Sequence, residues 1–521
     1  MRSRPVTARF SLTAAQKMRI ILGMKLYLIG HTYKYALEQI MLMLFPEERP
    51  EYPDAVPEAS PACVSSLYCG AVWCTSVCTL RLENGTFCAR ARVPASELTD
   101  ELTQTRLLTK IVKLAFYRAA LRAGLPKPEW GALSGIRPTK LLTRRLKAGM
   151  PPEAALRDFR REYDLSAARA SLCLDTAYTS LRVQKSLSPR DVCLYVGIPF
   201  CPTRCAYCSF VSNSVEKSMK LVEPFLEALL REVDATAETV SRLGLRVISI
   251  YMGGGTPTTL SAAMLERLCT QLSEKFDLSA LREYTVEAGR PDTITAEKLR
   301  VLRAHGVDRV SVNPQTMCDS VLEVIGRRHT AADILHALEL VRAEGGFAVN
   351  MDLIAGLPSD TPERFSKTLD QVLALEPENV TVHTLALKKG SRITLAVADG
   401  SDTALPQPAQ VAQMLDEAMR RLRSCGYAPY YLYRQKFMSG GFENVGWTKP
   451  GYDNLYNTCI MEELCSILAM GGGASTKLVD AARGHIERVF APKYPQEYIS
   501  SIEKTIADKA KIESFYQALA R

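Results

Sequence analysis

The sequence contains no long hydrophobic run and no recognisable secretion signal. A membrane-spanning helix needs about 18 or more consecutive apolar residues, and no segment reaches that length, which excludes such a span. The chain does contain 15 cysteines. Disulfide-rich proteins are typically short, secreted chains, so we expect these cysteines to be reduced thiols in a soluble, cytoplasmic protein.

No nucleic-acid recognition motif accompanies the net charge of +9. The basic residues are spread along the chain, which indicates a solvated surface with a bias toward anionic ligands and leaves nucleic-acid binding unsupported. The composition, 47% hydrophobic and 23% charged, is that of an ordinary globular protein. A chain of 521 residues has room for two or three domains.

Residues 1–23 are basic and contain no acidic residue. Such a segment is typical of a targeting sequence or of a misassigned start site. Because Met24 opens the first clear strand pattern, KLYLIGHTY, we expect an unstructured extension or a misassigned start rather than a transit peptide.

The remaining chain changes pattern twice, which predicts three regions. Residues 24–185 form an α+β unit that continues into a helical segment. Residues 190–388 alternate strands with helices, and residues 389–521 form a mixed C-terminal domain that we expect to cover the substrate.

The middle region predicts an α/β fold, a partial (β/α)6 barrel of the TIM type. Six βα units imply a parallel sheet with its helices outside, and ligands are expected at the C-terminal ends of its strands. The predicted strands are CLYVGI (193–198), RVISIYM (246–252), EYTVEA (283–288), DRVSVN (308–313), FAVNMDLIAG (347–356) and NVTVHTLAL (379–387).

A CxxxCxxC triplet, Cys201, Cys205 and Cys208, directly follows the first of these strands. Cysteine thiolates hold 4Fe–4S clusters, and three of them leave one iron open to another ligand. A zinc site is the alternative, but a closed zinc site needs a fourth ligand, and the first histidine after the loop is His305. Three buried cysteines are the other alternative, but Pro202 and Arg204 indicate a loop.

Spacing alone does not make a metal site, as Cys74 and Cys78 show. They lie in a segment that alternates like a strand, where four residues span about 13 Å. We therefore interpret them as small side chains that face a core.

Polar and glycine residues follow the other predicted strands. The sequence GGGTP, residues 253–257, follows the second strand, and its glycines allow a ligand to approach the backbone closely. Further polar residues stand at strand ends or on the next helix, where a barrel enzyme places its ligand contacts: Glu287, Gln315, Arg327 and Asp352. A surface ion pair or a helix cap is the alternative for each one alone.

Over residues 190–480 the chain resembles the radical S-adenosylmethionine enzymes, and within them the oxygen-independent coproporphyrinogen III oxidase family. The strand-end sequence LYVGIPFCPTRCAYC matches the cluster-binding motif of that family. The N-terminal region, WGALSGIRPTK and ENVGWTKPG together resemble the HemZ-type branch.

The resemblance assigns roles residue by residue. Cys201, Cys205 and Cys208 would hold the 4Fe–4S cluster, and Tyr195 and Tyr207 would wall the site as candidate catalytic residues. The expected cofactor-binding residues are Tyr195, Tyr207, Gly254, Gly255, Thr256, Glu287, Gln315, Arg327, Asp352 and, as a weaker match, Ala386.

The same resemblance implies a reaction. S-adenosylmethionine, as one or two molecules, would yield a 5'-deoxyadenosyl radical that abstracts hydrogen from a propionate of coproporphyrinogen III. Loss of carbon dioxide leaves a vinyl group, and two rounds give protoporphyrinogen IX. The implied partners are this tetrapyrrole and an electron donor such as a flavodoxin or ferredoxin. Arg434, Lys436 and Lys449 are candidate contacts for the propionates.

Two residues depart from the pattern of that family. Phe210 stands where well-known coproporphyrinogen dehydrogenases have a fourth cysteine, and it resembles the haem-chaperone branch instead. That branch carries an HNxxYW haem-binding segment, whereas this chain has Tyr456 in place of the histidine and keeps only Asn457. The alternatives are therefore a haem-binding chaperone-like protein and another tetrapyrrole-acting radical enzyme.

Overall fold

The computed structural model describes residues 23–46, 48–208, 213–214, 218–387, 391–398, 404–435 and 441–519. The expected extension over residues 1–23 lies outside these ranges, except for its last residue. The chain forms two compact units, Met1–Ser134 with Arg161–Ser166, and Gly135–Arg160 with Ala167–Arg521. In the parts that the structure describes, no helix has the length and apolar character to cross a membrane.

The first unit is a five-stranded sheet with two helices. The strand order is β2-β1-β3-β4-β5, in which β1 runs parallel to β2 and β3, and β3, β4 and β5 are antiparallel. The elements are β1 (Met24–Ile29), α1 (Lys34–Leu44), β2 (Pro50–Glu51), β3 (Ala62–Cys69), β4 (Trp73–Leu82), β5 (Gly85–Pro94) and α2 (Glu101–Arg122). The alternating burial of β4 confirms that Cys74 and Cys78 face the core.

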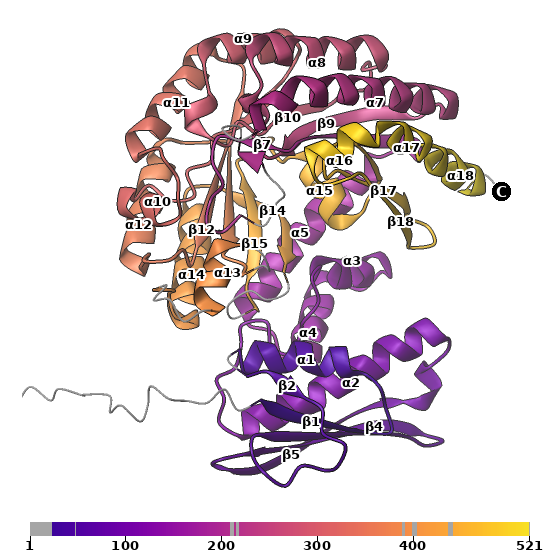
Figure 1. Cartoon of the computed structure of the whole chain (residues 1–521). Helices are drawn as coiled ribbons and strands as arrows, with labels where there is room; N and C mark the ends of the chain where they lie inside the picture. The colour runs from indigo at the N-terminus through magenta and orange to yellow at the C-terminus, as the bar shows by residue number, and fades with distance from the viewer. Residues whose placement is uncertain are drawn as a thin grey trace, which may run out of the picture. The chain divides into compact units, whose positions relative to one another are not determined.

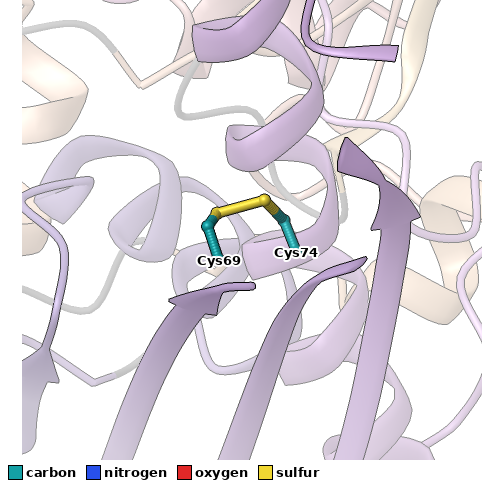
Figure 2. Close-up of a disulfide and its surroundings, with 2 residues drawn as sticks. All are labelled: Cys69 and Cys74. Atoms are coloured by element: carbon teal, nitrogen blue, oxygen red, sulfur yellow. A yellow bond between two sulfur atoms is a disulfide. The ribbon is translucent and has the colours of Figure 1, made fainter. Parts of the chain in front are cut away.

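A disulfide joins Cys69 to Cys74 in this unit (Figure 2). The two cysteines end β3 and begin β4, and they are directly opposite in the antiparallel register. The expectation of reduced thiols throughout is therefore wrong at this pair. The pairing depends on the hairpin register, which spacing along the chain does not reveal.

The second unit begins with α3 (Thr139–Lys147) and part of α4 (Pro152–Tyr163), followed by α5 (Ala167–Lys185). Its centre is a parallel sheet in the order β6-β9-β10-β11-β12-β13. The strands are β6 (Asp191–Ile198), β9 (Arg246–Gly254), β10 (Glu283–Val286), β11 (Arg309–Ser311), β12 (Ala348–Ala355) and β13 (Asn379–Thr384). The expected partial (β/α)6 barrel is confirmed.

The outer helices cover the convex side of this curved sheet (Figure 1). Serine or threonine caps start four of them and accept hydrogen bonds from first-turn N–H groups, which fixes where each loop ends. The helices are α7 (Val222–Leu243), α8 (Ala262–Lys275), α9 (Ala296–Ala304), α10 (Asp319–Val324), α11 (Ala331–Glu344) and α12 (Pro362–Ala374).

The C-terminal part adds five strands to the same sheet, at both of its edges. Strand β16 pairs parallel to β6, and β15 pairs antiparallel to β13. The elements are α13 (Arg392–Ala398), α14 (Pro408–Ser424), β14 (Ala428–Arg434), β15 (Glu443–Thr448), α15 (Leu455–Glu462), β16 (Ser466–Gly471), β17 (Ser475–Asp480), β18 (His485–Phe490), α16 (Pro495–Ser500), α17 (Ile502–Ala507) and α18 (Ala510–Leu519).

Candidate active site at the strand ends

The cysteine triplet lies in the loop that leaves the C-terminal end of β6. Cys201 belongs to β7 (Phe200–Cys201), a two-residue strand that pairs with β8 (Asn213–Ser214). Cys205 is buried, Cys208 is half-buried, and none of the three is in a disulfide. The N–H of Cys208 donates to the carbonyl of Cys205 at 3.2 Å, which closes a tight turn between these two thiols.

Neighbouring groups donate hydrogen bonds to two of the sulfur atoms. Thr256 Oγ1 lies 3.5 Å from Cys201 Sγ, and Arg290 Nη1 lies 3.6 Å from Cys205 Sγ. A cation and a hydroxyl beside a thiol favour the thiolate, the form that binds iron. Hydrogen bonds to ligand sulfurs also tune a cluster's reduction potential.

The glycine turn after β9 packs directly against the cysteine loop. Gly255 donates its N–H to the carbonyl of Ile198, and Thr256 donates to that of Phe200 at 2.7 Å. A Cβ on Gly255 would lie 2.4 Å from the Phe200 carbonyl oxygen. Gly254 has a φ of +105°, a conformation that glycine adopts at little cost.

Substituting Gly255→Ala should therefore destabilise the fold by about 1–3 kcal/mol, the usual cost of overpacking. We expect a lower denaturant midpoint together with reduced cluster content after reconstitution. Gly306→Ala is the control, since that position has a positive φ but open space around a Cβ. Equal losses in the two variants would contradict a specific close contact at Gly255.

Arg327 is buried and reaches from the loop after α10 to the aromatic residue of the triplet. Its Nη2 donates to Tyr207 OH at 3.2 Å, and its Nη1 donates to the carbonyl of Asn313 at 2.6 Å. Its Nε is buried without a hydrogen-bond partner. Burial raises the pKa of Tyr207, so the phenol stays neutral.

Glu287 follows β10 and faces the glycine turn. Tyr251 OH donates to its carboxylate at 2.5 Å, and a Cβ on Gly253 would lie 2.9 Å from that carboxylate. Burial raises the pKa of Glu287 to about 7, the Tyr251 hydrogen bond opposes that rise, and the charge of Asp352 adds to it.

Gln315 and Asp352 lie on neighbouring strand ends and are joined through the backbone. Gln315 N–H donates to the Asp352 carbonyl at 2.8 Å, and Gln315 adopts a positive φ of 67°. Such a conformation is uncommon for a residue with a side chain. Asn350 donates to the Asp352 carboxylate at 2.8 Å, and the side-chain hydrogen bonds together with His383 lower its pKa against the effect of burial. Ala386 stands just after β13.

Three tyrosines stack inside the barrel. The ring of Tyr195 on β6 lies 6.3 Å from that of Tyr251 and 6.1 Å from that of Tyr456 on α15. Glu283 fixes the start of α15 by accepting hydrogen bonds from the N–H groups of Leu455 and Tyr456, at 2.7 and 3.1 Å.

Sequence reasoning missed two residues of this site, Arg290 and His329. Arg290 contacts Cys205 and also donates to Thr203 Oγ1 at 3.0 Å. His329 is buried with both ring nitrogens lacking a hydrogen-bond partner, and burial together with Arg327 and Arg290 lowers its pKa to about 3. The sequences GRPD and GRRH, directly after a strand and a short helix, were the available signal.

The candidate propionate contacts do not gather at these strand ends. Arg434 is buried and its Nε donates to the carbonyl of Gly441 at 2.9 Å. Lys449 follows Thr448, which pairs with the first residue of β13, so it lies at the opposite end of the sheet. Lys436 and Phe210 lie outside the described residues.

The residues at this edge fit a 4Fe–4S cluster and a small charged cofactor. Three cysteine sulfurs are present on one loop, and two of them already accept hydrogen bonds. The buried Arg327 Nε without a partner is a donor available to a bound anion. The narrow space over Gly255 has no room for a side chain.

Comparison with known proteins agrees with this donor set. Residues 195–372 match the Radical SAM superfamily. The chain is 39% identical over 386 residues to the oxygen-independent coproporphyrinogen-III oxidase-like protein HemZ of Bacillus subtilis, covering 74% of this chain and 76% of that protein.

Two further relatives match a shorter part of the chain. The heme chaperone HemW of Bacillus subtilis is 32% identical over 48% of this chain and 64% of its own length. The oxygen-independent coproporphyrinogen III oxidase of Pseudomonas aeruginosa is 30% identical over 52% of this chain and 60% of its own length. The alignment with HemZ is thus the longer one and includes most of both proteins.

A family whose members use a 4Fe–4S cluster and S-adenosylmethionine accounts for the triplet, the glycine turn and the polar strand ends together. The chain belongs to the radical S-adenosylmethionine superfamily, in the HemZ-type branch of its oxygen-independent coproporphyrinogen III oxidase family.

Proposed function

We propose that this protein catalyses the oxygen-independent oxidative decarboxylation of coproporphyrinogen III to protoporphyrinogen IX. The observation that carries the proposal is the meeting of the triplet, the glycine turn and Arg327 at one edge of the barrel. The substrate is supported by the names of two relatives, the HemZ protein and the Pseudomonas aeruginosa oxidase.

Each strand-end residue has a role in this proposal. Cys201, Cys205 and Cys208 hold the cluster, which together with S-adenosylmethionine supplies a 5'-deoxyadenosyl radical. Arg327 binds the cofactor carboxylate through the Nε that has no partner in the protein. Glu287 faces the cationic part of the cofactor. The remaining proposed cofactor contacts are Gly254, Gly255, Thr256, Gln315, Asp352 and Ala386.

Tyr195 and Tyr207 wall the site in this proposal and exclude water from it. Tyr207 is held by Arg327 at 3.2 Å, and Tyr195 stacks with Tyr251 and Tyr456, so the rings have little freedom to move. A dry, closed site protects a reactive radical from side reactions. An electron donor such as a flavodoxin or ferredoxin completes the scheme, and the two decarboxylations consume two molecules of S-adenosylmethionine.

The affinity for S-adenosylmethionine should rise with pH around 7 because of Glu287. Below its pKa of about 7 the carboxyl is neutral, and above it the carboxylate attracts the sulfonium cation. We expect about a tenfold tighter dissociation constant at pH 8 than at pH 6, measured by calorimetry on reconstituted protein. Glu287→Gln should remove that difference, and an unchanged pH dependence in this variant would contradict the assignment.

The alternative is a haem-binding, chaperone-like role, which the HemW relative suggests. Tyr456 stands at the position of the haem-binding histidine, and it is 4% exposed and stacked against Tyr251 with ring centres 4.4 Å apart. A buried, stacked ring is poorly placed to reach a haem iron. This observation favours the enzyme.

Anaerobic turnover separates the two roles. Reconstituted protein receives dithionite and S-adenosylmethionine, with and without coproporphyrinogen III, and 5'-deoxyadenosine is quantified. We expect the substrate to stimulate 5'-deoxyadenosine formation and to be decarboxylated, while planar coproporphyrin III, the matched control, does neither. Stoichiometric haem binding without substrate-stimulated cleavage would overturn the proposal.

A further inference from the structure

A second group of three cysteines lies in the interior of the barrel, apart from the cluster-binding triplet. Cys193 is on β6, Cys459 is on α15, and Cys465 directly precedes β16. All three are at least nine-tenths buried. They meet because β16 pairs with β6, Ile467 opposite Cys193, while α15 packs close to both strands.

The sulfur atoms of these residues converge on one point. They all lie within 4.8 Å of one another, and Cys193 Sγ is 3.7 Å from Cys465 Sγ. A tetrahedral zinc ion with Zn–S bonds of about 2.3 Å holds its thiolates about 3.8 Å apart. Atoms this close share a point within about 2.8 Å of each, so small shifts bring all three to bonding distance.

The same distances separate this group from an iron–sulfur site. In a 4Fe–4S cluster each thiolate binds its own iron, so the ligand sulfurs surround the cluster and do not converge on one atom. Cys201, Cys205 and Cys208 are a different set of residues on a different loop. The two cysteine groups therefore suit different metals.

A disulfide accounts less well for this arrangement. Two sulfurs suffice for a disulfide, and they would have to close from 3.7 Å to about 2.05 Å. The surroundings are apolar, with Val183, Ile248 and Ile467 in contact with the group, so an oxidant has no route through water. A metal ion taken up during folding needs no such route.

We propose that Cys193, Cys459 and Cys465 bind a single thiophilic d10 metal ion, Zn(II) or Cu(I). Soft thiolate ligands select these ions over harder ones. Zn(II) leaves less negative charge in the apolar interior, because three thiolates carry one more charge than its own two and two more than that of Cu(I). The ion joins the strand that leads into the cluster loop to α15 and β16.

This site has a structural task. Tyr195 comes two residues after Cys193, and Tyr456 comes three residues before Cys459. An ion that fixes both cysteines also fixes the two tyrosines that stack 6.1 Å apart. A redox-inert ion such as Zn(II) performs this task without exchanging electrons with the cluster. The inference concerns metal binding and does not depend on the reaction proposed above.

Metal analysis of the full-length protein tests the site. After purification under anaerobic, reducing conditions with zinc and copper supplied during expression, mass spectrometry should find one zinc or copper per chain besides iron. Cys459→Ser and Cys465→Ser should each lose that ion. The control Cys269→Ser, which alters another buried barrel cysteine, should keep it. An ion retained in both site variants would overturn the proposal.

Two further measurements guard against misfolded variants and against zinc in an empty cluster site. A variant with Cys201, Cys205 and Cys208 all changed to alanine should lose iron but retain the zinc or copper. X-ray absorption on that protein should show a shell of sulfur neighbours only, at about 2.3 Å for zinc. Loss of the ion with the triplet, or a shell of oxygen and nitrogen, would contradict the assignment.

Discussion

Cys205→Ala should abolish binding of the 4Fe–4S cluster and, with it, cleavage of S-adenosylmethionine. Cys205 is the most buried thiol of the triplet, and it accepts a hydrogen bond from Arg290. Two remaining thiolates cannot hold a cubane that normally takes four protein ligands and here has three. Iron after anaerobic reconstitution should fall from about four per chain to well under one, with loss of the cluster's visible absorbance.

Cys425→Ala provides the matched control, because Cys425 is an exposed thiol in the same unit. It should bind iron and form 5'-deoxyadenosine like the parent protein. A Cys205→Ala variant that retained its iron and its absorbance would contradict the ligand assignment. Circular dichroism and the denaturant midpoint show whether the variant folds.

Arg327→Met should weaken S-adenosylmethionine binding while leaving the cluster in place. Removing one partner of a buried charged hydrogen bond costs about 2–5 kcal/mol in binding, so the dissociation constant should rise at least about thirtyfold. Methionine approximates the volume and flexibility of the side chain, which limits the loss of packing. Calorimetry on the reconstituted protein measures the dissociation constant, and iron content is recorded on the same sample.

The neighbouring Arg328→Met is the control, since Arg328 is exposed. It should bind cofactor like the parent protein. If Arg327→Met bound S-adenosylmethionine with unchanged affinity, Arg327 would be a residue that only positions Tyr207 and the Asn313 loop. Loss of iron in this variant would likewise contradict a role in the cofactor alone.

The barrel and its main motif could be predicted from the sequence because their signals are local. Continuous apolar runs such as that of β6 give fully buried parallel strands, and ligand residues follow at their C-terminal ends. The triplet, Glu287 and Arg327 could all be named from their places along the chain. The resemblance then added the cofactor, which spacing alone does not identify.

Features that depend on pairing between distant segments could not be predicted in this way. The strand nature of residues 466–471 was missed: the glycine-rich segment that follows was interpreted as coming after a helix, whereas it follows β16, which pairs with β6 far away in sequence. The Cys69–Cys74 disulfide depends on hairpin register, and the Cys193–Cys465 approach depends on the β6–β16 pairing. Arg290 contacts Cys205 across 85 positions of sequence.

The destination of the abstracted hydrogen tests the central claim most directly. Coproporphyrinogen III deuterated at the propionate carbons next to the ring is incubated anaerobically with reconstituted protein, reductant and S-adenosylmethionine, and 5'-deoxyadenosine is analysed by mass spectrometry. The proposal predicts deuterium in 5'-deoxyadenosine together with a vinyl-bearing product. Unlabelled 5'-deoxyadenosine with intact substrate would contradict it.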